Sequence, residues 1–160
     1  DLIIGAHPHV LQNAAEYTSP VTGKTALIYY SLGNLVSNQP YGYGPGRGHC
    51  ETGALALVRL KRLDDGSVAI DAAGYLTTYV LKPDVVHEYT VDGKTRSRTT
   101  RAYFIVPAAA VLADPTAYVG AAGTLLGRIE QAVNNGREIL GESGAELALF
   151  GFREYAAFEW

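Results

Sequence analysis

The chain has 160 residues, of which 48% are hydrophobic, and its formal net charge is -3. These values fit a globular chain of one domain and exclude both general disorder and the basic surface of a nucleic-acid-binding protein. The apolar runs are far shorter than a membrane span, and the lone Cys50 excludes an internal disulfide.

The first predicted element is a short strand at Leu2–Ile4, which Gly5 ends. Consecutive apolar residues before a glycine are typical of a strand that is covered on both faces. Ligands gather at the carboxyl ends of such strands, and His7 and His9 follow there. Pro8 biases His7 towards extended backbone, in which side chains two apart project to the same side. The two imidazoles can therefore converge on a metal ion, or they are loop histidines that bind nothing.

A β-hairpin is predicted next, with arms at Val10–Tyr17 and Thr25–Ser31 around a turn that contains proline and glycine. The first arm can also form a short helix, but the β-rich second arm needs a partner strand. The hairpin returns the chain to the histidines and brings the turn that follows it beside them. Ser31 and Asn34 are therefore candidate substrate-binding residues, and the alternative for Asn34 is that it serves the turn alone.

The segment Gln39–Cys50 alternates glycine with other residues and contains two prolines, which excludes a regular strand or helix. Such a loop lies on the surface and is either a connector or a lid over the neighbouring site. As a lid it would place Arg47 or His49 on an anionic substrate, and these two are candidate substrate-binding residues. Tyr41 or Tyr43 would then pack on that substrate. His49 is not counted among the metal ligands.

The pattern from Thr52 to Val106 predicts antiparallel strands. A first hairpin turns at Asp64–Gly66 and leads into a further strand. The strands of this part are predicted at Ala54–Leu60, Ser67–Ala72 and Tyr75–Leu81.

A second hairpin is predicted around Asp92-Gly93, with arms at Val85–Val91 and Ser97–Val106. Arginines cluster in and beside its second arm, and they mark either a solvated face or an anion-binding face for an acidic polymer. These are Arg96, Arg98 and Arg101.

Beyond Pro107 the sequence predicts helix. Asp114 and Pro115 suit an N-cap and a first helical residue, and Asn135-Gly136 suits the end. Apolar residues repeat between them at helical spacing, at Tyr118, Ala122, Leu125, Leu126, Ile129 and Val133. A shorter helical piece is expected at Arg137–Leu140, and Ala145–Trp160 is left unassigned. Residues 1–106 are thus a β-rich part and 107–160 a helical tail, with no firm domain boundary between them.

The first 39 residues carry two motifs that resemble a known family. The matching segments are Asp1–Gln12, Glu16-Tyr17 and Ile28–Val36. They are similar to the bacterial capsule synthesis protein CapA family, which is linked to poly-γ-glutamate synthesis and is related to the calcineurin-like metallophosphatases. That family carries Gly-His-His-Pro-His-Val and Tyr-Ser-Leu-Gly-Asn-Phe; here Ala6 replaces the first histidine and Leu35 the phenylalanine.

The resemblance implies an α/β (α+β) fold that is the C-terminal part of a metallophosphatase-like αββα sandwich. It also implies that His7 and His9 each coordinate one of two divalent metal ions, which would be manganese, iron or zinc. The other ligand motifs of metallophosphatases come earlier in sequence. We therefore expect the part of the protein N-terminal to Asp1 to supply them, and we do not expect this chain to be catalytically competent alone.

Three functions remain open at this stage. The first is a metal-dependent hydrolase-type half-domain in capsule or poly-γ-glutamate metabolism, with an anionic polymer or phosphoester-type substrate. The second is a non-catalytic family member that binds anionic polymer within membrane-associated synthesis or export machinery, which Ala6 favours. The third is a structural domain whose histidines bind nothing. The resemblance implies a location at the cell surface, and the chain itself contains no signal or transmembrane segment.

Overall fold

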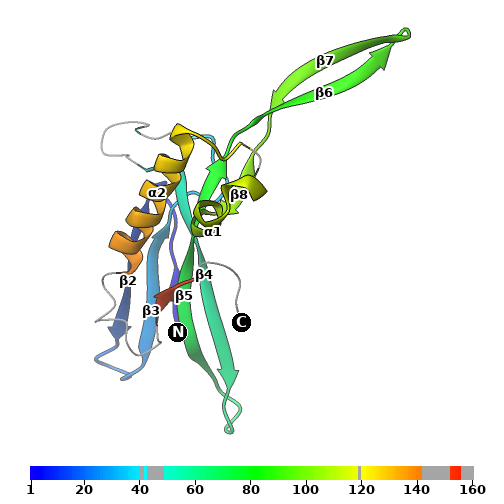
Figure 1. The fold of residues 1–160 in the computed structure, drawn as a ribbon. Coiled ribbons are helices and arrows are strands. Elements are labelled where there is room, and N and C mark those ends of the chain that lie inside the picture. Colours follow the sequence, from blue (N-terminus) through cyan, green and yellow to red (C-terminus); the bar gives the residue numbers. More distant parts are fainter. Residues whose placement is uncertain (40–41, 43–48, 119, 142–151, 156–160) are drawn as a thin grey trace.

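The computed structural model spans residues 1–160 and describes all of them except 40–41, 43–48, 119, 142–151 and 156–160. The described residues form a mixed α/β, strand-rich structure with helices towards the C-terminus (Figure 1). This agrees with the expected fold class at that coarse level. None of the described helices is long and apolar enough to cross a membrane.

The first sheet has the order β1-β3-β2 and contains both arms of the predicted hairpin. β1 pairs in parallel with β3, whereas β2 pairs antiparallel with β3. The hairpin prediction is therefore confirmed, and the alternative of a helix over Val10–Tyr17 is wrong. The strands are β1 at Leu2–Ile4, β2 at Leu11–Thr18 and β3 at Thr25–Leu32.

β1 departs from its prediction, because its apolar side chains are exposed. Leu2, Ile3 and Ile4 keep 39%, 52% and 53% of their surface accessible. The expectation of a strand covered on both faces is thus wrong for the described residues. The physical reason is position: β1 pairs with β3 alone, at the edge of its sheet, and the described residues do not cover its faces.

The second sheet is built on a long hairpin of β4 and β5, and β8 and the short β9 both pair with β5. The two strands predicted at Ser67–Ala72 and Tyr75–Leu81 are one continuous strand, which passes through Gly74 without a break. The bounds are β4 at Thr52–Arg62, β5 at Val68–Leu81, β8 at Phe104–Pro107 and β9 at Arg153–Glu154.

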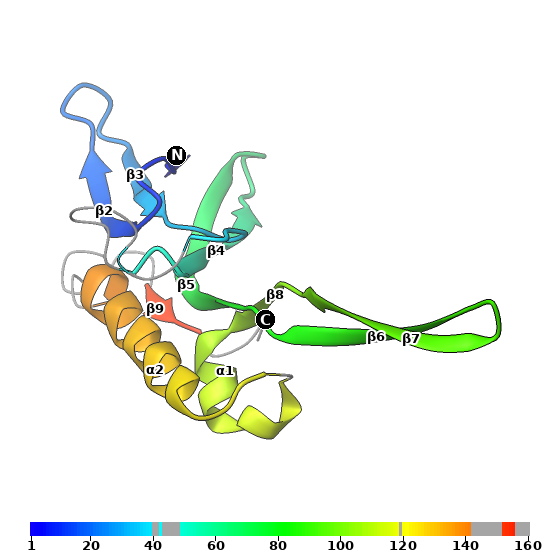
Figure 2. The ribbon, with the colours of Figure 1, turned by 90° about the horizontal axis from the view of Figure 1, so that it is seen from above.

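β6 (Asp84–Val91) and β7 (Lys94–Arg101) form a separate two-stranded ribbon that projects from the body of the molecule (Figures 1 and 2). The prediction that Ser97–Val106 forms one arm of this hairpin is wrong. The ribbon closes where the Ala102 amide donates to the carbonyl of Pro83, and the chain then enters β8 in the other sheet.

The helical part also begins differently from its prediction. The Asp114 carboxylate accepts from the Thr116 amide and caps a short 3-10 turn, while the main helix starts only at Thr124. The predicted end at Gly136 is confirmed, and the short piece after it is a π turn. The elements are α1 at Ala108–Ala113, η1 at Pro115–Ala117, α2 at Thr124–Gly136 and η2 at Arg137–Gly141.

The core of the described residues has two main parts. One part joins the two sheets, and Tyr29 at its centre donates its hydroxyl to the Gly74 carbonyl at 2.7 Å. The other part packs α1 and α2 on β5 and β8, with Ile129 and Val133 fully or almost fully buried as the apolar stripe predicted. In the segment left unassigned, Phe152 packs near Tyr29.

Candidate functional site

The two histidines lie at one edge of the first sheet. β1 and β3 run parallel, so the segments that leave their carboxyl ends meet at the same edge. A surface hollow of about 410 Å³ at this edge is lined by Ala6, His7, His9, Gly33, Asn34, Leu35 and Val36. The hairpin thus brings the turn after β3 beside the histidines, as predicted.

Asn34 is the polar centre of this site. Its side chain is almost completely buried, with 6% of the residue exposed. The amide nitrogen Nδ2 lies within 3.1 Å of the carbonyl oxygen of His9 and within 2.8 Å of that of Cys50. It also donates to Oε1 of Gln39 at 3.1 Å. Backbone carbonyls only accept hydrogen bonds, so these contacts determine which end of the amide is nitrogen.

The orientation of Asn34 determines the tautomer of His9. The amide oxygen Oδ1 of Asn34 lies 2.7 Å from Nδ1 of His9. Because Oδ1 can only accept, Nδ1 carries the proton and donates it to this bond. In the neutral ring Nε2 of His9 then keeps its lone pair. The side chain is exposed to solvent. Metal-binding histidines are commonly oriented by such a hydrogen bond on the second ring nitrogen.

The backbone of His9 is left-handed, with φ of 63°. The predicted extended geometry is therefore wrong at this residue. The two histidines line the same hollow although the backbone at His9 is not extended. The reason lies in Asn34, which bonds both the ring and the carbonyl of His9. A left-handed residue other than glycine costs about 1–2 kcal/mol, which these bonds offset.

His7 lines the same hollow from the strand side. Its side chain is exposed and forms no hydrogen bond with the described residues. Both imidazoles therefore face one open space, which a ligand can enter from solvent.

Two glycines hold the turn after β3 against the start of β4. Gly33 and Gly53 form an isolated antiparallel bridge. Gly33 has φ of 68°, and a Cβ there would lie 2.7 Å from the carbonyl oxygen of Thr52. A larger residue would push the turn away from β4, and Asn34 would move with it.

The other candidate residues have different surroundings. Ser31 has no exposed surface, and its hydroxyl accepts from the Gly33 amide, so it serves the turn and does not line the hollow. His49 is half-buried, and its Nδ1 accepts from Nδ2 of Asn135 on α2 at 2.7 Å. Arg47, with Tyr41 and Tyr43, lies outside the described residues.

The donor set of the hollow is two imidazoles. They suit manganese, iron or zinc, and the neutral ring of His9 presents a lone pair at Nε2. Among the described residues, no three His, Cys, Asp or Glu side chains come together as a metal-binding group. The described part of the chain thus fits a contribution of two ligands at most.

Sequence reasoning missed several residues that shape this edge. Gln39 and the Cys50 carbonyl hold Asn34, and Asn135 holds His49. None of them carries a local signal, because each acts on a residue that is distant in sequence.

Comparisons with known proteins agree with the motifs. A family model for the bacterial capsule synthesis protein PGA_cap matches residues 1–39. The capsule biosynthesis protein CapA of Bacillus anthracis is 38% identical over 71 residues, which cover 44% of this chain and 14% of that protein. No solved structure matches the chain significantly. The chain is therefore a relative of the CapA family of bacterial capsule synthesis proteins, and residues 1–39 carry the family's segment.

Proposed function

We propose that this chain supplies His7 and His9 to a dinuclear divalent-metal site of hydrolase type in a capsule synthesis protein. The observation that carries the proposal is the hydrogen bond from His9 Nδ1 to the buried Asn34. In the neutral ring this bond leaves the lone pair on Nε2, and it orients the ring as the hydrogen-bond partners of metal-binding histidines do. The open hollow gives both imidazoles access to a ligand.

The chain's own residues would bind and orient the metal ions. His7 and His9 would each hold one ion, and Asn34 would keep the His9 ring in place. Bound metal would supply Lewis acidity towards an anionic or phosphoester-type substrate, with poly-γ-glutamate as the expected polymer. The remaining ligands would come from the part of the protein N-terminal to Asp1.

That part would also complete the fold. The exposed side chains of Leu2, Ile3 and Ile4 support a further layer on β1, as a metallophosphatase-like αββα sandwich would require. The whole protein would then act at the cell surface, together with membrane-associated capsule machinery.

Metal content measured by elemental mass spectrometry tests this proposal. The measurement uses this chain and the full-length product, each with His7→Ala and His9→Ala. His87→Ala is the matched control, because His87 is exposed on β6 and bonds Thr100 on the ribbon. We expect about two metal ions per full-length protein, lost with either site histidine and kept in the control. Unchanged metal content in both site variants would refute the proposal.

A second candidate function rests on the ribbon of β6 and β7. Residues directly opposite in an antiparallel pair share a face, so the register sorts the side chains. His87 lies opposite Arg98 and Tyr89 opposite Arg96, with Lys94 further along the same face. The acidic Asp84 and Glu88 are on the other face.

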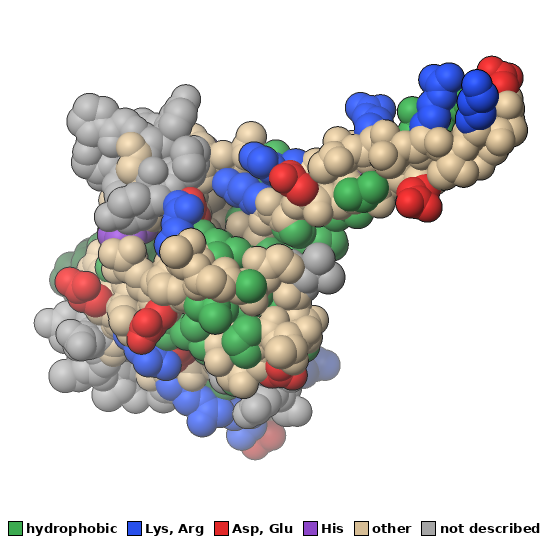
Figure 3. All heavy atoms as spheres, turned by 45° about the horizontal axis from the view of Figure 1, so that its top comes forward, with side chains coloured by type: hydrophobic (Ala, Val, Ile, Leu, Met, Phe, Trp, Pro, Cys, Tyr) green, Lys and Arg blue, Asp and Glu red, His purple; other side chains and the backbone are tan. Residues whose placement is uncertain are grey.

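This separation of charge is visible in Figure 3, where basic side chains crowd one side of the projecting ribbon. Cations on alternate residues of a strand are about 7 Å apart, which suits an extended polyanion. We propose this basic face as the polymer-binding surface of a non-catalytic role. Arg96→Gln with Arg98→Gln should weaken the binding of poly-γ-glutamate, measured by fluorescence anisotropy at low salt. The control replaces Lys61 and Arg62 with Gln, because both are also exposed cations. Equal binding by both double variants would rule out the face.

A further inference from the structure

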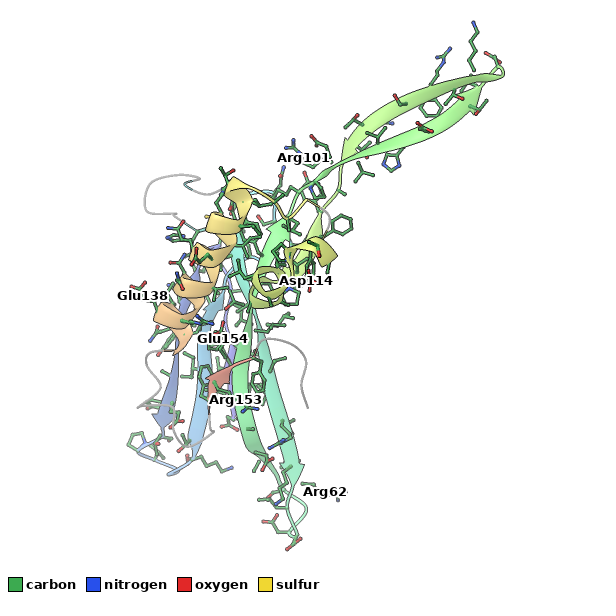
Figure 4. All side chains as sticks on the ribbon, viewed as in Figure 1. Arg62, Arg101, Asp114, Glu138, Arg153 and Glu154 are labelled. Atoms are coloured by element: carbon green, nitrogen blue, oxygen red, sulfur yellow. The ribbon has the colours of Figure 1, made fainter. Side chains whose placement is uncertain are left out.

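A second hollow lies where the ribbon joins the body of the molecule. It has a volume of about 290 Å³, and its wall includes three cationic side chains and one carboxylate: Lys82, Arg101, Arg128 and Glu51. Lys82 directly follows β5, Arg101 is the last residue of β7, and Arg128 lies on α2. Figure 4 shows Arg101 at this junction, above the top of α2, and Figure 3 shows basic side chains gathered there.

Glu51 is already neutralised within the wall. Only 7% of the residue is exposed, and its Oε2 accepts from the Tyr79 hydroxyl at 2.5 Å. Its Oε1 forms an ion pair with Arg128. These contacts explain why a carboxylate is tolerated at a buried position. Of the three cations, Arg128 is therefore compensated by a carboxylate within the wall.

The other two cations have weak partners. Nζ of Lys82 reaches only the backbone carbonyl of Gln39, at 3.4 Å. Arg101 pairs with Asp84 at 3.3 Å, and both of these side chains are more than half exposed. Burial lowers the pKa of Lys82, and repulsion from Arg128 and Arg101 lowers it further against the pull of Glu51. The hollow therefore concentrates more positive charge than its own carboxylate compensates.

We propose that this hollow binds a small oxyanion, a carboxylate or a phosphate group, between Lys82, Arg101 and Arg128. Guanidinium groups match the planar or tetrahedral oxygens of these anions, and an ammonium adds a point charge. The apolar wall formed by Val80, Pro83 and Leu125 strengthens the field inside the hollow.

The proposed anion site is separate from the histidine hollow, because the two share no lining residue. Gln39 lies between them. Its carbonyl accepts from Lys82, and its side chain accepts from Asn34. Binding at the anion site can therefore be measured without any metal, and its result does not depend on the proposed metal site.

The test is an NMR titration of the isotope-labelled chain with inorganic phosphate and, separately, with glutarate, at constant ionic strength without metal. We expect amide shifts to change around residues 79–83 and 120–128. Lys82→Gln and Arg101→Gln should each weaken the binding about tenfold, since each removes a charged hydrogen bond. Arg62→Gln is the control, because Arg62 is an exposed cation at the far end of β4 (Figure 4).

The two anions distinguish the source of the oxyanion. Stronger binding of phosphate would assign the site to phosphoryl groups, and stronger binding of glutarate would assign it to carboxylates. Both results support the proposal. It is overturned if neither anion binds the wild-type chain, or if Lys82→Gln and Arg101→Gln bind as well as Arg62→Gln. Both substituted side chains are at least partly exposed, so the variants should fold, which circular dichroism would verify.

Discussion

Nδ1 of His9 and Oδ1 of Asn34 lie 2.7 Å apart, although the two residues are 25 positions apart in sequence. One comes from the segment after β1 and the other from the turn after β3. The parallel pairing of these strands is what brings them together. A buried amide thereby determines the tautomer of an exposed ring.

The tautomer of His9 is directly measurable. We expect the neutral ring to carry its proton on Nδ1, because the Asn34 amide oxygen accepts it. Two-bond nitrogen–proton NMR correlations report this state. In Asn34→Ala the preference for Nδ1–H should be lost, while the His87 signals, an internal reference on the distant ribbon, should stay unchanged. A ring protonated on Nε2 in the wild-type chain would contradict the arrangement.

The Tyr29 hydroxyl should contribute measurably to stability. Tyr29 is fully buried and donates to the Gly74 carbonyl, and burial raises its pKa. Tyr29→Phe removes this buried hydrogen bond, which should cost about 0.5–1.5 kcal/mol in the free energy of unfolding. Tyr30→Phe is the control, since Tyr30 is 50% exposed and should change the urea midpoint little. Equal effects of the two substitutions would refute this role for Tyr29.

Two glycines should respond to alanine in opposite directions. Gly33→Ala places a methyl group against the Thr52 carbonyl at a positive φ, so we expect a loss of at least about 1 kcal/mol. Gly127 lies exposed in α2 with open space around it, and Gly127→Ala should stabilise by about 0.5–1 kcal/mol. Thermal unfolding of both variants checks the signs.

The cap of η1 should make stability depend on pH. A hydrogen bond from the Thr116 hydroxyl, with help from backbone amides, holds the pKa of Asp114 below its ordinary value of 3.8. The folded state therefore releases its proton more readily than the unfolded state. The stabilisation is complete above that ordinary value and is lost as the pH falls through the lower pKa of the folded state.

Urea unfolding at neutral and at acidic pH measures this effect. We expect the wild-type chain to exceed Asp114→Asn in stability at pH 7, with the difference shrinking towards pH 2. Thr116→Val removes the hydroxyl donor and should reduce the pH dependence in the same way. A difference between wild type and Asp114→Asn that is constant with pH would contradict the assignment.

Local sequence patterns predicted the strands and the helical stripe well, because alternation and turn residues act over short distances. The hairpin of β2 and β3 is an example, since its turn and its β-rich second arm are both visible in the sequence. The same reasoning placed Asn34 beside the histidines. It failed where the structure of a segment depends on the strand with which it pairs. The β-rich run Ser97–Val106 divides between two sheets, and the point of division follows only from the tertiary pairing.

Two further errors have the same origin. Leu2–Ile4 is apolar enough for a buried strand, but burial requires a neighbouring layer that no local pattern can specify. Asp114 does form a cap before Pro115, but it caps a 3-10 turn. Gly120 and Gly123, which have positive φ, separate this turn from the long helix. The pair Glu51–Arg128 joins residues 77 positions apart and left no trace in the local pattern.

The two hydrogen bonds between Asn34 and His9 have a consequence for the affinity of a ligand. Because Asn34 bonds its ring and its carbonyl together, folding has already restricted the side chain to one orientation. A ligand that binds Nε2 would meet a ring with little remaining rotational freedom, and it would not have to order that ring itself. Less conformational entropy would be lost on binding than with a freely rotating histidine. The ring of His9 is in this sense organised for a ligand before the ligand arrives.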